Sequence, residues 1–242
     1  MIIFAPKMGK DHFQFRQFIV RQDRCAMKVG TDGTLLGAWA ETAVPDGRIL
    51  DIGTGTGLIA LMMAQRFPAS QVTAVEIDAI ACQQASENVA ASPFASRIRC
   101  IQADIADFAD AEGFDAIVSN PPYFVQSLTC PDGQRTLARH TASLSYESLM
   151  KSAYRLLRDD GLFSVIIPAD SYPQIDAAAR LQCFFPSRLC AVKTTPAKNP
   201  RRYLIEYRKH AVEEVDTTVG VIEDAPCVRS DWYTRLTKDF YL

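Results

Sequence analysis

The chain has 242 residues, of which 48% are apolar and 22% charged, so it can bury a large core and has the composition of a soluble globular protein. No apolar run approaches the roughly 20 residues that span a bilayer, and the N-terminus lacks the regions of a signal peptide. The seven cysteines are isolated, which argues against a disulfide framework and against a zinc site. We therefore expect a cytoplasmic protein without a metal ion or a membrane anchor. Oligomeric state is not legible in the sequence, and a monomer is our expectation.

The predicted elements begin with an N-terminal extension, residues 1–33, in which two alternating stretches at 13–20 and 25–29 flank turn residues at 22–24. This pattern predicts a β-hairpin. A short apolar helix follows at 34–40, and from there strand and helix patterns alternate. The predicted strands are 48–52, 72–77, 98–103, 114–119 and 162–167, with two more near 189–194 and 203–208. The predicted helices between them are 58–67, 79–91, 146–157 and about 172–184.

Alternating strands and helices indicate a Rossmann-like α/β fold with a seven-stranded, mostly parallel sheet and helices on both faces. We expect residues 1–242 to form a single domain that includes the N-terminal hairpin. Ligands of such sheets bind beyond the carboxyl ends of the strands. The residues that follow the first four strands are therefore the first candidates for a functional site.

A glycine-rich loop follows the first strand and leads directly into a helix. It reads Asp51-Ile-Gly53-Thr54-Gly55-Thr-Gly57, and glycines let the backbone turn tightly and approach a ligand closely. The spacing G-x-G-x-G differs from the dinucleotide-binding G-x-G-x-x-G, which disfavours a nicotinamide oxidoreductase. An acid directly before the loop suits a ligand with an ammonium group. The alternative is a tight turn with no ligand.

Acidic residues end the next two strands as well. Glu76 ends the second strand, where a carboxylate commonly accepts hydrogen bonds from a ribose diol. Asp104 follows the third strand and could accept from an adenine amino group, with Ile77 and Ile105 on the two faces of the ring. A nucleoside pocket with a partner for an ammonium group, but without a phosphate grip, fits S-adenosylmethionine better than NAD.

The fourth strand ends in the most specific motif, Asn120-Pro121-Pro122-Tyr123. Two successive prolines stiffen the loop and remove two N–H donors. The side-chain oxygen of Asn120 and the carbonyl of Pro121 can then accept both hydrogens of one NH2 group, while Tyr123 stacks on a flat substrate. Such acceptors favour the pyramidal nitrogen that forms as a methyl group arrives, so they stabilise the transition state more than the ground state. The motif therefore predicts methylation of a planar amide or aromatic amine.

Together with the glycine loop and Glu76, this motif resembles that of amino-methyltransferases that modify adenine N6, guanine N2 or glutamine N5. Three further segments, at 15–18, 23–39 and 233–242, make the chain similar over nearly its whole length to the bacterial tRNA1(Val) adenine-N6 methyltransferases. The resemblance implies that the chain methylates the adenine 3′ of the anticodon in a valine tRNA, with S-adenosylmethionine as methyl donor. It also implies that Lys28, Thr31 and Asp32 lie near the methionine end of the cofactor, with Asp51 closest to its ammonium group.

Charge is unevenly distributed although the net charge is only −2. Residues 1–28 carry six Lys/Arg against two acids and residues 193–210 carry six against one, whereas residues 29–192 carry eleven against eighteen. The basic ends are consistent with a phosphate-binding surface or with the protective charges of an edge strand. The resemblance favours a tRNA surface formed by Lys193, Lys198, Arg201 and Arg202. It assigns no role to Arg135, Arg139 and His140.

Two rival functions remain open. A protein glutamine N5-methyltransferase would use the same pair of acceptors for an amide NH2, but such enzymes usually carry a helical N-terminal domain instead of a short hairpin. A binding module that has lost catalysis would not be expected to keep Asp51, Glu76 and Asn120 together.

Overall fold

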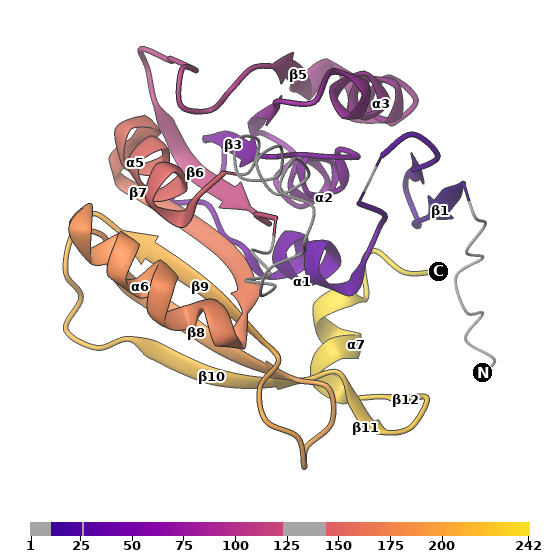
Figure 1. Cartoon of the computed structure of the whole chain (residues 1–242). Coiled ribbons are helices and arrows are strands. Elements are labelled where there is room, and N and C mark those ends of the chain that lie inside the picture. Colours follow the sequence, from indigo (N-terminus) through magenta and orange to yellow (C-terminus); the bar gives the residue numbers. More distant parts are fainter. Residues whose placement is uncertain (1–10, 26, 123–143) are drawn as a thin grey trace, which may run out of the picture.

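The computed structural model describes residues 11–25, 27–122 and 144–242, and an eight-stranded sheet crosses its centre (Figure 1). The strand order is β10-β8-β9-β7-β6-β3-β4-β5. Strands β3 to β7, and also β8 with β10, pair in parallel, while β9 runs antiparallel between β7 and β8. The strands are β3 (Arg48–Ile52), β4 (Gln71–Glu76), β5 (Ile98–Gln102), β6 (Phe114–Ser119), β7 (Leu157–Pro168), β8 (Phe185–Lys193), β9 (Arg202–Arg208) and β10 (Asp216–Val221).

Helices cover both faces of the sheet, because its central strands are apolar on both sides. One core packs α1, α2, α3 and α7 against one face, and the other packs α5 and α6 against the opposite face. The helices are α1 (Thr31–Trp39), α2 (Leu58–Arg66), α3 (Ala79–Ala90), α5 (Tyr146–Leu156), α6 (Tyr172–Leu181) and α7 (Asp231–Thr237), with short 3₁₀ turns at Ala95–Arg97 and Ala169–Ser171. The expected α/β class and mostly parallel sheet are therefore confirmed.

The N-terminal hairpin is also confirmed, but its turn lies elsewhere than predicted. Strands β1 (His12–Gln14) and β2 (Ile19–Arg21) pair around a turn closed by the Phe15 N–H, which donates to the carbonyl of Phe18 at 2.9 Å. The predicted turn at 22–24 and second strand at 25–29 are wrong. Two main-chain N–H groups of that stretch bond to side chains instead: the Arg24 N–H donates to Gln84 and the Val29 N–H donates to Gln22.

The C-terminal end of the chain packs against this hairpin. The N–H of Arg16 donates to the carbonyl of Phe240 at 2.8 Å, and the ring of Tyr241 stacks on Phe15 with centroids 5.9 Å apart. Tyr241 also bonds to Tyr233 of α7 through their hydroxyl groups. The family-like segments at both ends of the chain therefore meet on one side of the molecule.

The sequence patterns after residue 144 located the main elements and missed the edge of the sheet. Helix α5 ends at Leu156, and β7 begins at once with Leu157 opposite Phe114, so the strand starts ahead of the expected stop at Asp160 and Gly161. The eighth strand, β10, the hairpin of β11 (Glu223–Ala225) and β12 (Val228–Arg229), and helix α7 were not predicted. Strand β10 is exposed over most of its length, which explains its weak apolar signal.

Candidate active site

The carboxyl ends of β3, β4, β5 and β6 meet at one edge of the sheet, as the parallel pairing requires. The glycine loop follows β3, and its three glycines Gly53, Gly55 and Gly57 have φ of 70°, 56° and 82°. A Cβ atom at Gly53 or Gly55 would meet no other atom within 4 Å, so the backbone there borders open space. At both positions glycine is needed for the left-handed conformation and not for lack of room.

Asp51 lies beneath this loop and is completely buried. Its Oδ2 accepts from the Thr54 hydroxyl at 2.5 Å and from the Ala60 N–H at 3.1 Å, so it ties the loop to the start of α2. Its Oδ1 has no hydrogen-bond partner among the residues that the structure describes. Burial raises the pKa of Asp51 to about 7. The carboxyl group therefore supports the loop, and its second oxygen is a buried acceptor that none of the described residues satisfies.

Glu76 holds the other side of the crevice at the end of β4. Its Oε2 accepts from the Gly55 N–H at 2.8 Å, and its Oε1 accepts from the Asp78 N–H at 3.1 Å. Only 9% of the residue is exposed. The two bonds fix the carboxylate between the glycine loop and the start of α3, where the Asp78 side chain caps the helix.

The residues expected around an adenine ring differ in exposure. Ile77 is 53% exposed. Asp104 is also exposed, and its Oδ1 accepts from the Ala106 N–H at 2.9 Å. Ile105, in contrast, is 5% exposed and belongs to the core beneath α5. Ile77 and Asp104 thus face solvent, whereas Ile105 offers a ligand little surface.

The motif after β6 lies beside the glycine loop because β6 and β3 are neighbours. Ser119 pairs with Ile52, and its hydroxyl donates to the Ile52 carbonyl at 3.0 Å. Asn120 is half-buried and Pro121 is buried. The stacking residue of the motif, Tyr123, lies outside the described residues, as do Arg135, Arg139 and His140.

The start of α1 borders the same edge. Lys28 and Thr31 are exposed, while the carboxylate of Asp32 accepts from Arg202 Nε at 2.9 Å in an ion pair. We expected Asp32 to bind the cofactor and Arg202 to bind RNA. The structure joins these two side chains in an ion pair, so each of them already has a charged partner within the protein.

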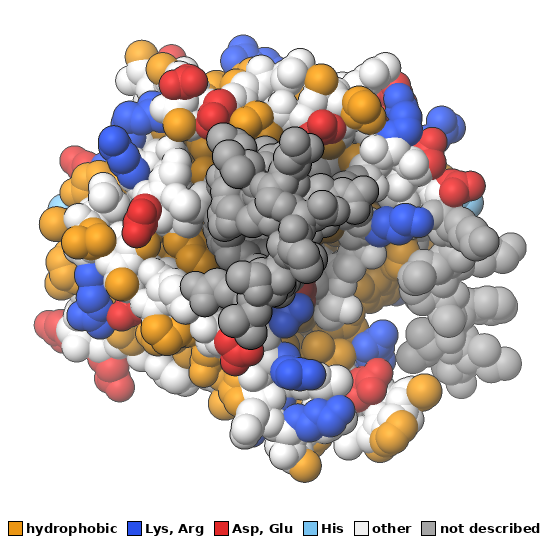
Figure 2. Space-filling model, in the orientation of Figure 1, with side chains coloured by type: hydrophobic (Ala, Val, Ile, Leu, Met, Phe, Trp, Pro, Cys, Tyr) orange, Lys and Arg blue, Asp and Glu red, His pale blue; other side chains and the backbone are white. Residues whose placement is uncertain are grey.

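The other basic candidates lie on this edge too. Lys193 ends β8, and Lys198 and Arg201 lie in the loop that leads to β9. Arg202 pairs with Pro168 at the carboxyl end of β7. Because β7 runs parallel to β6, this end lies on the same edge of the sheet as the end of β6. Figure 2 shows Lys and Arg side chains gathered over the loop that joins β8 and β9. All four basic candidates therefore lie on the edge that carries the glycine loop.

Sequence reasoning missed two buried amides, Gln84 and Asn88 of α3, which bond to the N-terminal segment and to the glycine loop. The signal was present in the sequence. The two residues are four positions apart, on the face of the helix that carries Ala81 and Ala85, and a polar residue on a buried face needs a partner.

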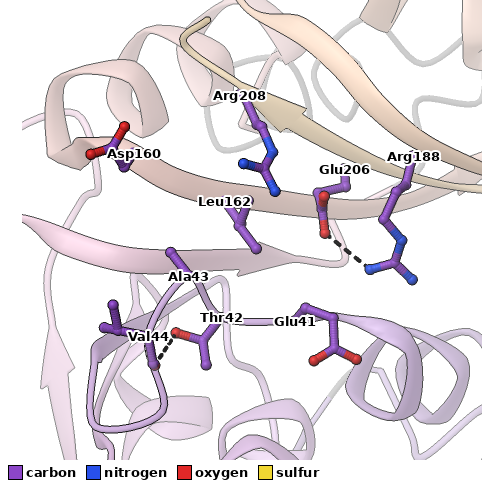
Figure 3. A pocket seen from close by; sticks show the side chains of 9 residues that line it. All are labelled: Glu41, Thr42, Ala43, Val44, Asp160, Leu162, Arg188, Glu206 and Arg208. Carbon is purple, nitrogen blue, oxygen red and sulfur yellow. Dashed lines mark hydrogen bonds and ion pairs between the residues drawn. The ribbon is translucent and has the colours of Figure 1, made fainter. Parts of the chain in front are cut away.

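A separate cavity of about 570 Å³ lies between the loop after α1 and the strands β7, β8 and β9 (Figure 3). Its lining includes Asp160 near the start of β7 and Arg208 at the end of β9, so it lies toward the amino-terminal edge of the sheet. Inside it, Arg188 pairs with the buried Glu206 and lies over the ring of Trp39 at 4.2 Å. These mutual pairings account for its buried polar groups, and the cavity is separate from the candidate site.

In the parts of the chain that the structure describes, no group of three His, Cys, Asp or Glu residues could hold a metal ion. No helix in those parts is long and apolar enough to cross a membrane.

Comparison with known proteins agrees with this geometry. The family model described as methyltransferase small domain matches residues 28–181. Two curated proteins, each named tRNA1(Val) (adenine(37)-N6)-methyltransferase, align with 97% of this chain and 99% of their own length. They come from Bacteroides thetaiotaomicron, at 46% identity over 239 residues, and from Phocaeicola vulgatus, at 50% over 235 residues. A solved structure of a predicted O-methyltransferase from Agrobacterium tumefaciens has a TM-score of 0.66 at 21% identity, covering 86% of this chain and 96% of its own, which shows the shared fold.

Proposed function

Because the chain belongs to the tRNA1(Val) (adenine(37)-N6)-methyltransferase family, we propose that it transfers a methyl group from S-adenosylmethionine to the N6 atom of an adenine. The adenine is the one that follows the anticodon of a valine tRNA. One observation carries the proposal. The open glycine loop, Glu76, Asn120 and the basic loop before β9 all lie on the same edge of the sheet.

The residues at this edge fit S-adenosylmethionine. The backbone at Gly53 and Gly55 borders open space, and Glu76 is held beside it where it can accept from ribose hydroxyls. The exposed Ile77 and Asp104 suit one face and the amino edge of an adenine. The buried Oδ1 of Asp51 accepts no hydrogen bond from the described residues, and an ammonium group is a donor that would compensate its burial. When bound, the cofactor would supply a methyl group bonded to a positively charged sulfonium sulfur, and the leaving group would be the neutral thioether.

The chain itself then has to align and activate a weak nucleophile. The lone pair of an exocyclic amine is delocalised into the ring, and two acceptors on its hydrogens favour the pyramidal nitrogen of the transition state. In our proposal the side-chain oxygen of Asn120 and the carbonyl of Pro121 accept these hydrogens, and Tyr123 stacks on the base. The proton lost from the nitrogen passes to solvent after transfer, so no strong base is required.

Lys193, Lys198 and Arg201 are proposed to bind the phosphates of the tRNA. They lie on the active edge, and Lys198 and Arg201 are exposed. Arg202 is better assigned to the ion pair with Asp32. To reach the site, the adenine must leave the stack of the anticodon loop, which costs a few kcal/mol and is offset by contacts of this kind.

A protein glutamine amide would satisfy the same acceptors, so the substrate class needs a direct test. Purified protein is incubated with labelled S-adenosylmethionine and unmodified total tRNA, and the nucleosides are identified after digestion. We expect N6-methyladenosine, and no label in RNA from an Asn120→Ala variant. Label in protein, or none in RNA although the cofactor binds, would transfer the assignment to the glutamine amide.

A further inference from the structure

We propose that Gln84 and Asn88 are positioning residues of the cofactor site, because their amides hold residues 21–25 in place as a wall of its nucleoside end. This inference rests on the proposed function and adds to it two residues and a chain segment that lie outside the strand-end motifs.

Asn88 joins the N-terminal segment to the glycine loop. Its Oδ1 accepts from the Arg21 N–H at 2.9 Å, and its Nδ2 donates to the carbonyls of Arg21 at 2.9 Å and of Thr56 at 2.8 Å. Thr56 lies between Gly55 and Gly57. Asn88 is 1% exposed, and both its N–H groups and its oxygen are used. A displacement of the segment therefore breaks hydrogen bonds of the same side chain that holds the glycine loop.

Gln84, one turn earlier on α3, holds the next part of the segment. Its Oε1 accepts from the Arg24 N–H at 3.1 Å, and its Nε2 donates to the Asp23 carboxylate at 2.7 Å. It is completely buried. The Arg24 side chain pairs with Glu87 on the same helix. Two adjacent residues of the segment are thus fixed to α3 by both main-chain and side-chain bonds.

The held segment passes the end of β4. Cys25 is 9% exposed, and burial raises the pKa of its thiol to about 11, with the carboxylates of Glu76 and Asp78 adding to the rise. Cys25 directly follows Arg24, whose N–H is bonded to Gln84 of α3, the helix that begins three residues after Glu76. Further along, the Val29 N–H donates to Gln22 Oε1 at 2.8 Å, which closes the segment on itself before α1 begins.

Helix α3 is well placed to couple these parts. Gly57 packs against Ala85, where a Cβ atom would come within 3.4 Å of the alanine Cβ. Ala85 lies between Gln84 and Asn88, so one face of the helix contacts the glycine loop and the segment together. If the amides served stability alone, replacing them would lower the melting temperature without changing cofactor affinity.

The test uses Gln84→Glu, which keeps the acceptor for Arg24 and turns the donor toward Asp23 into a repelling oxygen. The matched control is Gln71→Glu, the same change at an exposed position at the start of β4, on the edge of the sheet opposite the candidate site. Binding of S-adenosylhomocysteine is measured by calorimetry, and amide exchange is followed over residues 21–29. We expect Gln84→Glu to weaken binding about tenfold and to speed exchange in the segment, with the control within about twofold of wild type.

Two further variants keep the test decisive. Adding Asp23→Asn to Gln84→Glu reverses the direction of the hydrogen bond between the two side chains, so it is expected to restore affinity. Asn88→Asp is expected to weaken binding independently, because a carboxylate oxygen then faces the carbonyls of Arg21 and Thr56. Affinity equal to wild type in Gln84→Glu and in Asn88→Asp, with faster exchange in residues 21–29, would overturn the inference. If the wild-type protein bound no S-adenosyl ligand, the proposed function would fail first.

Discussion

The carboxyl group of Asp51 sits in an environment that should be visible in the pH dependence of stability. It is completely buried, and burial raises its pKa from 3.8 to about 7, a rise that the hydrogen bonds from Thr54 and Ala60 reduce and the nearby charge of Glu76 increases. Between these two values the folded chain keeps a proton that the unfolded chain has released. The free energy of unfolding therefore falls as the pH rises through this window, and the effect is complete above about pH 7.

The magnitude follows from the linkage relation. One proton corresponds to about 1.36 kcal/mol per pH unit, so raising the pH from about 5 to about 6.5 should cost the cofactor-free protein about 2 kcal/mol through Asp51. Asp51→Asn keeps the size of the side chain and an acceptor oxygen for Thr54 or Ala60, but it cannot titrate. The variant should lack this part of the pH dependence.

The assay is urea unfolding of wild type and Asp51→Asn at several pH values across this window, without cofactor. Titrating groups that do not interact with Asp51 contribute equally to both proteins, so the difference between the two curves isolates Asp51 together with its interaction with Glu76. Between the lower and the upper pH, we expect the free energy of unfolding of the variant to rise by about 2 kcal/mol relative to that of the wild type. Parallel curves would refute the argument that the buried carboxyl group is protonated in the folded chain.

Three further outcomes are expected. Asn120→Ala should bind the cofactor normally but lower kcat by about a hundredfold or more, since an acceptor that acts in the transition state is lost; normal turnover in steady-state assays would disprove its role. Lys198→Ala and Arg201→Ala should each weaken tRNA binding and reduce the slope of log K against log salt by about 0.7 to 0.9, with unchanged cofactor affinity; an unchanged slope would remove the residue from the RNA surface. Gly220→Ala would place a Cβ atom 2.4 Å from the ring of Trp232 and should cost about 1–3 kcal/mol in urea unfolding, whereas a neutral result would mean that α7 shifts freely.

Local patterns were sufficient for most of the fold. Strand β3, helix α2 and strand β6 have the expected bounds within one residue, because continuous apolar runs and capping residues are encoded locally. The hairpin turn was misplaced since Asp23 and Arg24 look like turn residues but are held by Gln84 of α3, 60 or more positions away. Strand β10 is mostly exposed and pairs on one side only, so its sequence lacks the apolar run of a central strand.

The candidate site, like the fold, was predictable in part from local sequence and depended in part on tertiary contacts. The sequence by itself determined the residues that follow the parallel strands, Asp51 with its glycine loop, Glu76 and Asn120, because the carboxyl ends of such strands must meet at one edge. Only the tertiary structure decided which of the remaining candidates share a contact. It paired Asp32 with Arg202, which are 170 positions apart, and buried Ile105 in the core. Contacts of this kind depend on how helices and loops pack across the sheet, and no local pattern of residues encodes that packing.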